Sequence, residues 1–350
     1  MPRDQSSRRP RRPTMADVGR LAGVTATTVS FVLNEDSGQT ISDATRRRVL
    51  DAVAQLDYRP NKQARGLRTR RAGLIGFVTD EIASDPFAGA AILGAHEVAW
   101  SRGSMLMVVN TTRESKILRR VIDELVDQPV DAMIFGVVGT RRLRVPDALK
   151  GVPAVLLNCW AAGDIYPSVL PDEVAGGRDA TRMVLEAGHR RIAYLAGPSA
   201  AWASRARLRG FREALVGAGV DPASTTVLEG DFRTGSGYEL TRKLLDQPAG
   251  RRPTAILCGN DRMAVGAYLA LAEAGLRIPD DMSVVGYDDQ NNLAADVHPA
   301  LSTIRMPYYQ MGRWAAEHLV DGAARDKPSG RTYLPCPPVV RGSVGPPRAG

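Results

Sequence analysis

Four polar side chains each follow a short apolar run, at places where a carboxylate or an amide could hold a small molecule. These residues are Asp80, Asn158, Asn260 and Asp288. Carboxylates accept paired hydrogen bonds and the planar guanidinium of Arg207 donates them, which suits a polyhydroxylated or heteroaromatic ligand. Each residue also has a plainer explanation, because Asn260 could simply cap a helix and Asp288 could be a loop acid.

Three aromatic residues complete this candidate binding set. Phe87 and Phe232 could supply an apolar wall for the face of a sugar or a base, and Tyr308 could contact the same ligand. All three could instead belong to the hydrophobic core. The residues alone therefore leave the ligand class open between these two chemistries.

Enzymatic motifs are missing from the sequence. It contains no GxGxxG fingerprint, Walker loop, GxSxG elbow or HExxH pair, and its four histidines are isolated. The three cysteines form no CxxC pair, so we expect neither a disulfide framework nor a zinc site and interpret all three as buried: Cys159, Cys258 and Cys336. We predict a binding protein with no cofactor and no metal, rather than an enzyme.

Strands and helices alternate from Leu74 onward and must position the candidate residues. The predicted strands are Leu74–Val78, Met105–Val109, Ala132–Val137, Ala154–Leu157, Ile192–Leu195, Ala255–Cys258 and Ser283–Val285. Alternation with amphipathic helices is typical of parallel sheets covered on both faces, and the strands are too many for one compact sheet. We expect two doubly wound lobes, with ligand in the cleft beyond the carboxyl ends of their strands.

A helical module precedes the strands. Thr14 and Asp17 have the spacing of a capping box, Gly23 interrupts the first helix, and Thr25 can cap a second. Two short helices around such a tight turn have helix-turn-helix geometry. Their apolar positions are Val18, Leu21, Ala22, Val29, Val32 and Leu33.

A third helix, Asp43–Leu56, is expected to begin after Ser42 and to cover the other two. In a helix-turn-helix the second helix enters the major groove and its N-terminal side chains meet base edges. Here these are Ala26, Thr27 and Ser30. The alternative from pattern alone is a three-helix packing domain with no ligand.

The net positive charge is confined to the N-terminal fifth of the chain. Residues 1–71 hold 15 basic and 7 acidic residues, whereas the remainder holds 31 of each. Neutralising phosphates releases counterions, so this module is the part expected to bind nucleic acid. Residues 1–13, rich in Arg and Pro, are interpreted as a disordered, solubilising tail.

A basic connector, residues 58–71, follows the helical module. Asn61 can cap a short helix with Ala64 and Leu67 on one side, but a helix this short, with Gly66 inside it, should fold only on a template. An exposed Leu beside arginines is typical of a wedge that enters the minor groove. A solvated linker is the alternative.

No run of about 20 apolar residues is present, and the N-terminus has arginines without the apolar run of a signal peptide. We therefore expect a cytoplasmic protein with no membrane partner.

The N-terminal module resembles the DNA-binding end of the lactose/galactose repressor (LacI/GalR) family. The matching runs are Thr14–Val18, Ala22–Thr25, Thr28–Asn34 and Asp57–Asn61, and a looser likeness continues to Ser343. The resemblance implies dimeric binding to a palindromic operator, with a hinge helix whose Leu67 is the wedge. The DNA-binding residues predicted in this way are Thr14, Thr25, Ala26, Thr27, Thr28, Ser30, Asn34, Tyr58, Asn61, Ala64, Arg65 and Leu67.

Ligand residues also follow from the resemblance. Arg207 and Asp288 match positions that grip the effector in similar repressors, while Asn158 and Asn260 match less uniform positions. A sugar is favoured because sugars are the commoner effectors in the family. Two departures concern DNA contact: Phe31 stands where the family usually has an arginine, and Gly66 lowers helix propensity by about 1 kcal/mol relative to Ala.

The combined prediction is a DNA-binding repressor whose affinity for double-stranded operator DNA is controlled by a small-molecule effector. Its fold is an N-terminal all-α helix-turn-helix domain plus an α/β two-lobed periplasmic-binding-protein-like domain of two doubly wound parallel sheets. Predicted boundaries are 1–13, 14–60, 61–72 for the hinge and 73–345 for the sensor. A homodimer is expected, with a tetramer as the alternative. The competing functions are a response to a purine or other metabolite, and a catalytically active small-molecule-binding protein.

Overall fold

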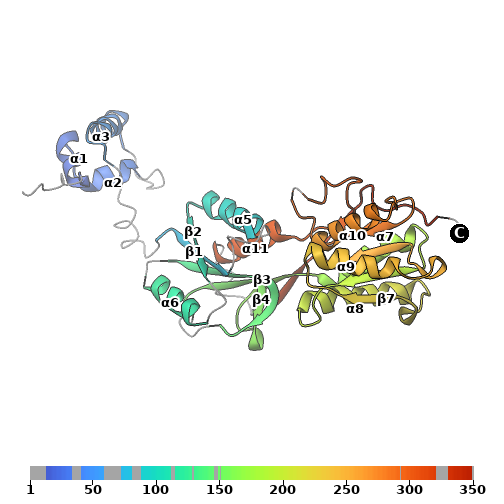
Figure 1. Ribbon diagram of the computed structural model, residues 1–350. Coiled ribbons are helices and arrows are strands. Elements are labelled where there is room, and N and C mark those ends of the chain that lie inside the picture. Colours follow the sequence, from blue (N-terminus) through green and yellow to red (C-terminus); the bar gives the residue numbers. More distant parts are fainter. Residues whose placement is uncertain are drawn as a thin grey trace, which may run out of the picture. The chain divides into compact units, whose positions relative to one another are not determined.

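The computed structural model describes residues 13–33, 41–58, 72–80, 88–111, 115–127, 130–145, 149, 151–291, 293–320 and 330–348. The chain divides into two compact units, Met1–Ala72 and Gly73–Gly350. Each is described separately (Figure 1).

The described residues of the first unit form three helices: α1 (Met15–Ala22), α2 (Ala26–Leu33) and α3 (Asp43–Gln55). The predicted capping box is present, because the Asp17 amide donates to Thr14 Oγ1 at 3.3 Å and the Thr14 amide donates to Asp17 Oδ2 at 2.9 Å. Gly23 ends α1 in the left-handed region with φ of 66°. Ser42 caps α3 by accepting from the Thr45 amide. The predicted helix-turn-helix is confirmed.

The core of this unit is formed by one side of each helix and by Tyr58, which lies shortly after α3. Its buried members are Val18, Ala22, Val29, Val32, Val49, Ala52 and Tyr58. Leu21, which shares the apolar spacing of Val18 and Ala22, is 47% exposed. Gly19 takes the inward place instead, because a Cβ there would lie 2.8 Å from the Val24 carbonyl oxygen. The turn after α1 packs too closely to leave room for a side chain.

Lobe one of the second unit is a parallel sheet covered on both faces. In the described residues its strand order is β11-β5-β4-β3-β1-β2. The strands are β1 (Leu74–Asp80), β2 (Met105–Thr111), β3 (Ala132–Leu143), β4 (Ala154–Ala161), β5 (Ser168–Pro171) and β11 (Arg331–Leu334). Helices α5 (Ala88–Ser101) and α11 (Tyr308–Val320) cover one face, and α6 (Ser115–Val126) covers the other.

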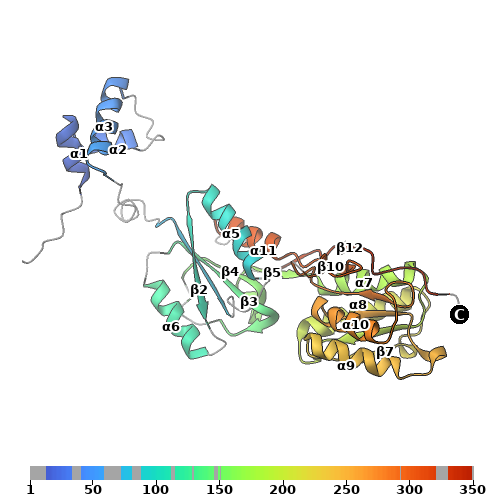
Figure 2. The same ribbon diagram turned by 45° about the horizontal axis from the view of Figure 1, so that its top comes forward.

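Lobe two repeats this architecture with the parallel order β7-β6-β8-β9. Its strands are β6 (Ile192–Ala196), β7 (Thr226–Glu229), β8 (Ala255–Cys258) and β9 (Ser283–Val285). Helices α7 (Glu173–Glu186) and α8 (Trp202–Gly217) pack on one face, and α9 (Thr234–Leu245) and α10 (Asp261–Glu273) pack on the other. The predicted pair of doubly wound lobes is confirmed, and both are visible in Figure 2.

The chain passes between the lobes three times. It leaves lobe one between β5 and α7, returns between β10 (Thr303–Ile304) and α11, and leaves again between β11 and β12 (Pro338–Val339). Tyr308, at the second crossing, packs against the buried residues of both lobes. Lobe one is therefore completed by segments far from it in sequence.

Candidate functional site

The start of α2 presents small hydroxyl and methyl side chains to solvent. Thr25, Ala26 and Thr27 are exposed and Thr28 is half-buried. The Thr28 amide donates to Thr25 Oγ1 at 3.1 Å, so Thr25 caps the helix, as predicted from the sequence. An exposed, capped N-terminus is the part of a recognition helix that reaches base edges.

Other predicted DNA-binding residues occupy different environments. Ser30 and Tyr58 are 8% and 6% exposed, and Tyr58 belongs to the helical core, where burial raises the pKa of its hydroxyl. The Thr14 hydroxyl donates to Asp17 at 2.7 Å within the capping box. The remaining five lie outside the described residues: Asn34, Asn61, Ala64, Arg65 and Leu67.

Arg207 stands at the centre of a buried charged cluster in lobe two. Its Nε and Nη2 donate to the two carboxylate oxygens of Glu173 at 2.7 and 3.0 Å, and its Nη1 donates to the Gly259 carbonyl at 2.6 Å. Asp288 Oδ1 lies 3.5 Å from Nη2. The guanidinium carbon also lies 3.7 Å from the centroid of the Tyr287 ring. The structure thus brings two predicted residues, Arg207 and Asp288, into one ion-pair network.

The electrostatics of this cluster keep the arginine charged. Burial alone would lower the pKa of Arg207, but the carboxylates of Glu173 and Asp288 raise it well above its usual value. Burial also raises the pKa of the Tyr287 hydroxyl, which therefore stays protonated. The two carboxylates outnumber the single guanidinium in the cluster, so it has no excess positive charge.

Phe232 and Asn260 join the same edge of lobe two. The Asn260 side chain donates to the Phe232 carbonyl at 3.0 Å and accepts from the Met263 amide at 2.9 Å, so the capping role considered for it from the sequence is present. A Cβ at Gly197, after β6, would lie 2.1 Å from the Phe232 ring. Loops after β6, β7 and β8 therefore meet around Phe232, beside the Arg207 cluster.

Asp80 and Asn158 lie together at the corresponding edge of lobe one. Asp80 accepts from the Val138 amide at 2.8 Å and pairs with Arg141. Asn158 accepts from the Thr140 hydroxyl at 2.6 Å and donates to the Val137 carbonyl at 3.0 Å. Both side chains are buried and brace the end of β3.

Backbone strain marks several of these residues. Among the described residues, six that are not glycine have positive φ, and three belong to the predicted binding set: Asn158 at 60°, Phe232 at 67° and Asp288 at 115°. Such conformations cluster at ligand sites, where the surrounding structure enforces them. Phe87, the remaining aromatic candidate, lies outside the described residues.

Sequence reasoning missed the partners that complete both groups. Glu173 lies just after β5, as Asp288 lies just after β9. Because β5 was not predicted, Glu173 was not recognised as a polar residue that follows a strand. Arg141 and Thr140 lie in the part of β3 that extends beyond the predicted Ala132–Val137. No local pattern links them to Asp80 and Asn158.

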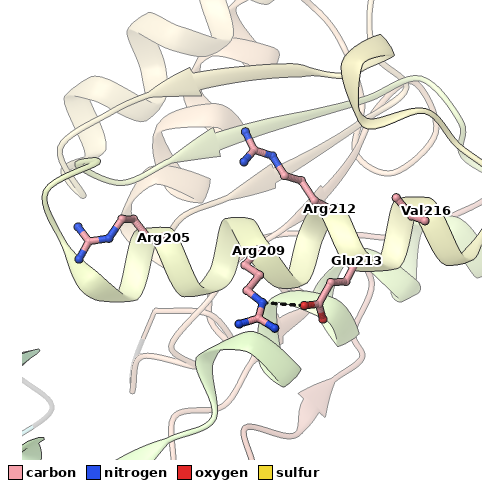
Figure 3. Close-up of a pocket in the computed structure, with 5 residues that line it drawn as sticks. All are labelled: Arg205, Arg209, Arg212, Glu213 and Val216. Carbon is pink, nitrogen blue, oxygen red and sulfur yellow. Dashed lines mark hydrogen bonds and ion pairs between the residues drawn. The ribbon is translucent and has the colours of Figure 1, made fainter.

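A depression of about 420 Å³ lies along α8 (Figure 3). It is lined by Arg205, Arg209, Arg212, Glu213 and Val216. Arg205, Arg209, Arg212 and Val216 recur every three or four positions and are exposed, whereas Arg207 is buried. Arg209 pairs with Glu213 at 2.8 Å within this face. The depression is therefore separate from the predicted effector residues.

Within the described residues, no group of three or more His, Cys, Asp or Glu side chains could hold a metal ion. The three cysteines are buried and unpaired, as predicted. A search of the described helices found none with the length and apolar character that a membrane crossing requires.

Comparisons with known proteins agree with both units. The model for bacterial regulatory proteins of the lacI family matches residues 14–61, and the model for a periplasmic binding protein-like domain matches residues 181–344. The ribose operon repressor of Escherichia coli K12 is 34% identical over 310 residues, covering 88% of this chain and 92% of its own length. The sucrose operon repressor of Escherichia coli is 33% identical over 338 residues, with 95% and 99% covered.

Solved structures extend the agreement to the fold. The Lac repressor dimer bound to operator and the anti-inducer ONPF superposes with a TM-score of 0.77 at 30% identity, covering 96% of this chain and 100% of that chain. Helix-turn-helix, two-lobed sensor and sequence identity over most of the length therefore coincide. The chain belongs to the lacI family of bacterial regulatory proteins, and it is a DNA-binding repressor that responds to a small-molecule effector, not an enzyme.

Proposed function

We propose that this repressor binds a palindromic operator as a homodimer and that its effector is a neutral sugar held between the two lobes. The Arg207 cluster carries this proposal. Its guanidinium is already paired with Glu173 and Asp288, and in lobe one Arg141 is paired with Asp80. A phosphorylated or carboxylated ligand would meet excess negative charge in lobe two, and a buried uncompensated charge is costly.

Ligand hydroxyl groups suit the hydrogen-bonding groups that remain beside these ion pairs. Asp288 and Asp80 offer carboxylate acceptors, Asn260 offers its amide, and Phe232 offers an apolar ring next to Asn260. Sugar recognition by paired polar groups and an aromatic wall needs no net charge. Two relatives are named for sugar operons. A purine or another neutral metabolite is the second candidate, because the same acceptors and ring could hold it.

Operator binding tests the proposal. Duplexes selected from a random palindromic library would be titrated with the full chain, with and without D-ribose, sucrose, ribose 5-phosphate or hypoxanthine. We expect a neutral sugar to change operator affinity about 5–150-fold, the usual range of such coupling, and the phosphorylated sugar to have no effect. Asp288→Asn should remove the response and leave operator binding in place.

The matched control is Asp296→Asn, an exposed acid in the following loop. It should respond like the unsubstituted protein. A full response from Asp288→Asn would remove this residue from the effector site, and a response to ribose 5-phosphate alone would overturn the charge argument.

Dimerisation is proposed to use the outer side of lobe one. Leu93 and Trp100 on α5 are 51% and 66% exposed, and Met105 and Val108 on the edge strand β2 are 50% and 42% exposed. Grouped exposed apolar side chains of this size mark interaction surfaces. Leu93→Glu combined with Met105→Glu should weaken self-association about tenfold or more, as sedimentation velocity would measure.

Val340→Glu serves as the control, because Val340 is exposed in lobe two, away from α5 and β2. An unchanged dimer in the Leu93/Met105 variant would exclude this face. Sedimentation of the unsubstituted protein also separates the dimer from the alternative tetramer.

Location and the hinge complete the proposal. A protein that represses transcription from bacterial operators works in the cytoplasm, in contact with the nucleoid. In this proposal the connector, residues 61–72, becomes ordered on DNA, and Leu67 is the wedge. Residues 14–60 bind DNA, and residues 73–345 bind the effector. These boundaries and residues follow from the sequence resemblance.

A further inference from the structure

We propose that Trp160 and Trp202 form a clasp between the two lobes, which holds them together and sets how readily effector is admitted. Trp160 lies near the end of β4 in lobe one, and Trp202 is the first residue of α8 in lobe two. Their ring centroids are 5.7 Å apart at an interplanar angle of 62°, an edge-to-face contact. Such a pair shifts an open–closed equilibrium about 2- to 10-fold beyond simple burial. This contact joins the lobes without passing through any of the three chain crossings.

The clasp depends on a ribbon that projects from the lobe-one sheet. Pairing of β3 with β4 is interrupted between Gly136 and Arg141, then resumes from Arg141–Cys159 to Leu143–Ala161. Asn158 has φ of 60° at the point where β4 turns. Bulges of this kind bend a strand and redirect its side chains. In Figures 1 and 2 the labelled β3 and β4 lie on the side of lobe one nearer to lobe two.

Contacts within lobe one hold the Trp160 ring in place. The Arg331 guanidinium lies 5.0 Å from its centroid, and Arg331 is itself fixed by Asp164 at 2.8 Å. A cation over an indole face is attractive and leaves the ring edge available for another contact. Trp160 and Trp202 are both half-buried, so neither ring is part of the fully buried core of its lobe.

The same elements carry the predicted effector residues. In lobe two, α8 bears both Trp202 and Arg207, so a shift of the helix moves both. In lobe one, Asp80 and Asn158 brace the ribbon through Arg141 and Thr140. A ligand that donates hydrogen bonds to the Asp80 carboxylate competes with Arg141 and loosens the ribbon. This coupling rests on the proposed effector site, whereas the clasp itself does not.

Spin-label distances test the clasp in the full-length protein without any ligand. Labels would be attached at Arg142→Cys in the ribbon and Arg212→Cys on α8, both exposed sites. The native thiols would stay unlabelled, because all three are buried and burial raises their pKa. Labelled chains would be diluted with unlabelled chains so that only distances within one chain are measured.

The expected result is one narrow distance distribution that becomes longer and broader in Trp160→Ala and in Trp202→Ala. Combining the two substitutions should add nothing, because either one removes the whole contact. Trp314→Ala is the control, since Trp314 stacks on His318 at 3.9 Å within α11 alone. Distances that are the same in all variants would overturn the clasp, with circular dichroism verifying that each variant is folded.

A second arm separates the clasp from the proposed function. Affinities for D-ribose and sucrose, measured calorimetrically, should change about 2- to 10-fold in both tryptophan variants and by no more in the double variant. A distance change without sugar binding by any variant would keep the clasp and contradict the sugar proposal. Sugar binding with distances that are the same in all variants would contradict the clasp and keep the sugar proposal.

Discussion

Arg207→Ala is expected to lower the free energy of unfolding of the Gly73–Gly350 unit by about 3–5 kcal/mol, because it removes the partner of two buried carboxylates. Glu173 is fully buried and Asp288 is 8% exposed. Without the guanidinium, both carboxylates lose the positive charge that compensates them in the protein interior. Chemical denaturation followed by circular dichroism would measure the loss. The same variant should also lose the effector response, so stability and function would decline together.

Arg205→Ala and Arg209→Ala supply matched controls on the same helix. Both side chains are exposed and take part in the outer depression of α8 (Figure 3). Their unfolding transitions should be indistinguishable from that of the unsubstituted protein, because exposed ion pairs contribute little. If Arg207→Ala unfolded at the same denaturant concentration as these controls, the cluster would not be the structural centre of lobe two.

Asp261 is expected to make the same unit less stable as the pH rises from about 4 to about 7. Burial raises the pKa of Asp261 to about 7. Hydrogen bonds from Thr303 and Gln290 lower this pKa, whereas the nearby Asp289 carboxylate raises it. The folded protein therefore holds this proton more tightly than the unfolded chain. Stability from this group is complete below pH 4 and is lost as the pH approaches 7, by on the order of 4 kcal/mol.

Asp261→Asn provides the measurement, because an amide reproduces the protonated carboxyl. Its oxygen can accept from the Gln290 amide and its nitrogen can donate to the Thr303 hydroxyl, the two contacts Asp261 makes at 2.7 and 2.6 Å. The variant should match the unsubstituted protein at pH 4 and exceed it at pH 8. His189, whose pKa is lowered by burial, gives the opposite slope in both proteins and cancels in their difference. Parallel profiles would contradict the assignment.

Features encoded within a few residues were predictable from the sequence. The capping box of Thr14 and Asp17, the left-handed Gly23 and the Ser42 cap each involve neighbours within one helical turn. The strands β8 and β9 match their predicted limits, because buried parallel strands are continuous apolar runs between turn signals. Strands β7 and β11 were missed, because each is a short edge strand in which half-buried and exposed positions alternate. Strand β5 was also missed, although it lies inside its sheet and is buried.

The candidate site divides along the same line. The residues that follow the strands pointed to Asp288, Asn260 and Asn158, and the resemblance to the repressor family pointed to Arg207. The sequence could not determine what those side chains contact. Glu173 precedes Arg207 by 34 positions and Arg141 follows Asp80 by 61. The packing of α7 beside α8 brings the first pair together, and the pairing of β1 with β3 brings the second pair together.

By itself, then, the sequence determined a helix-turn-helix, a basic connector and two α/β lobes, because helix caps, apolar periodicity and charge are local properties of the chain. Only the tertiary structure decided that Leu21 faces solvent, that Tyr58 is buried, and that Trp160 reaches Trp202. Such outcomes depend on which surfaces meet once helices and sheets have packed together. Packing across long sequence separations leaves no periodic trace in the residues that take part in it.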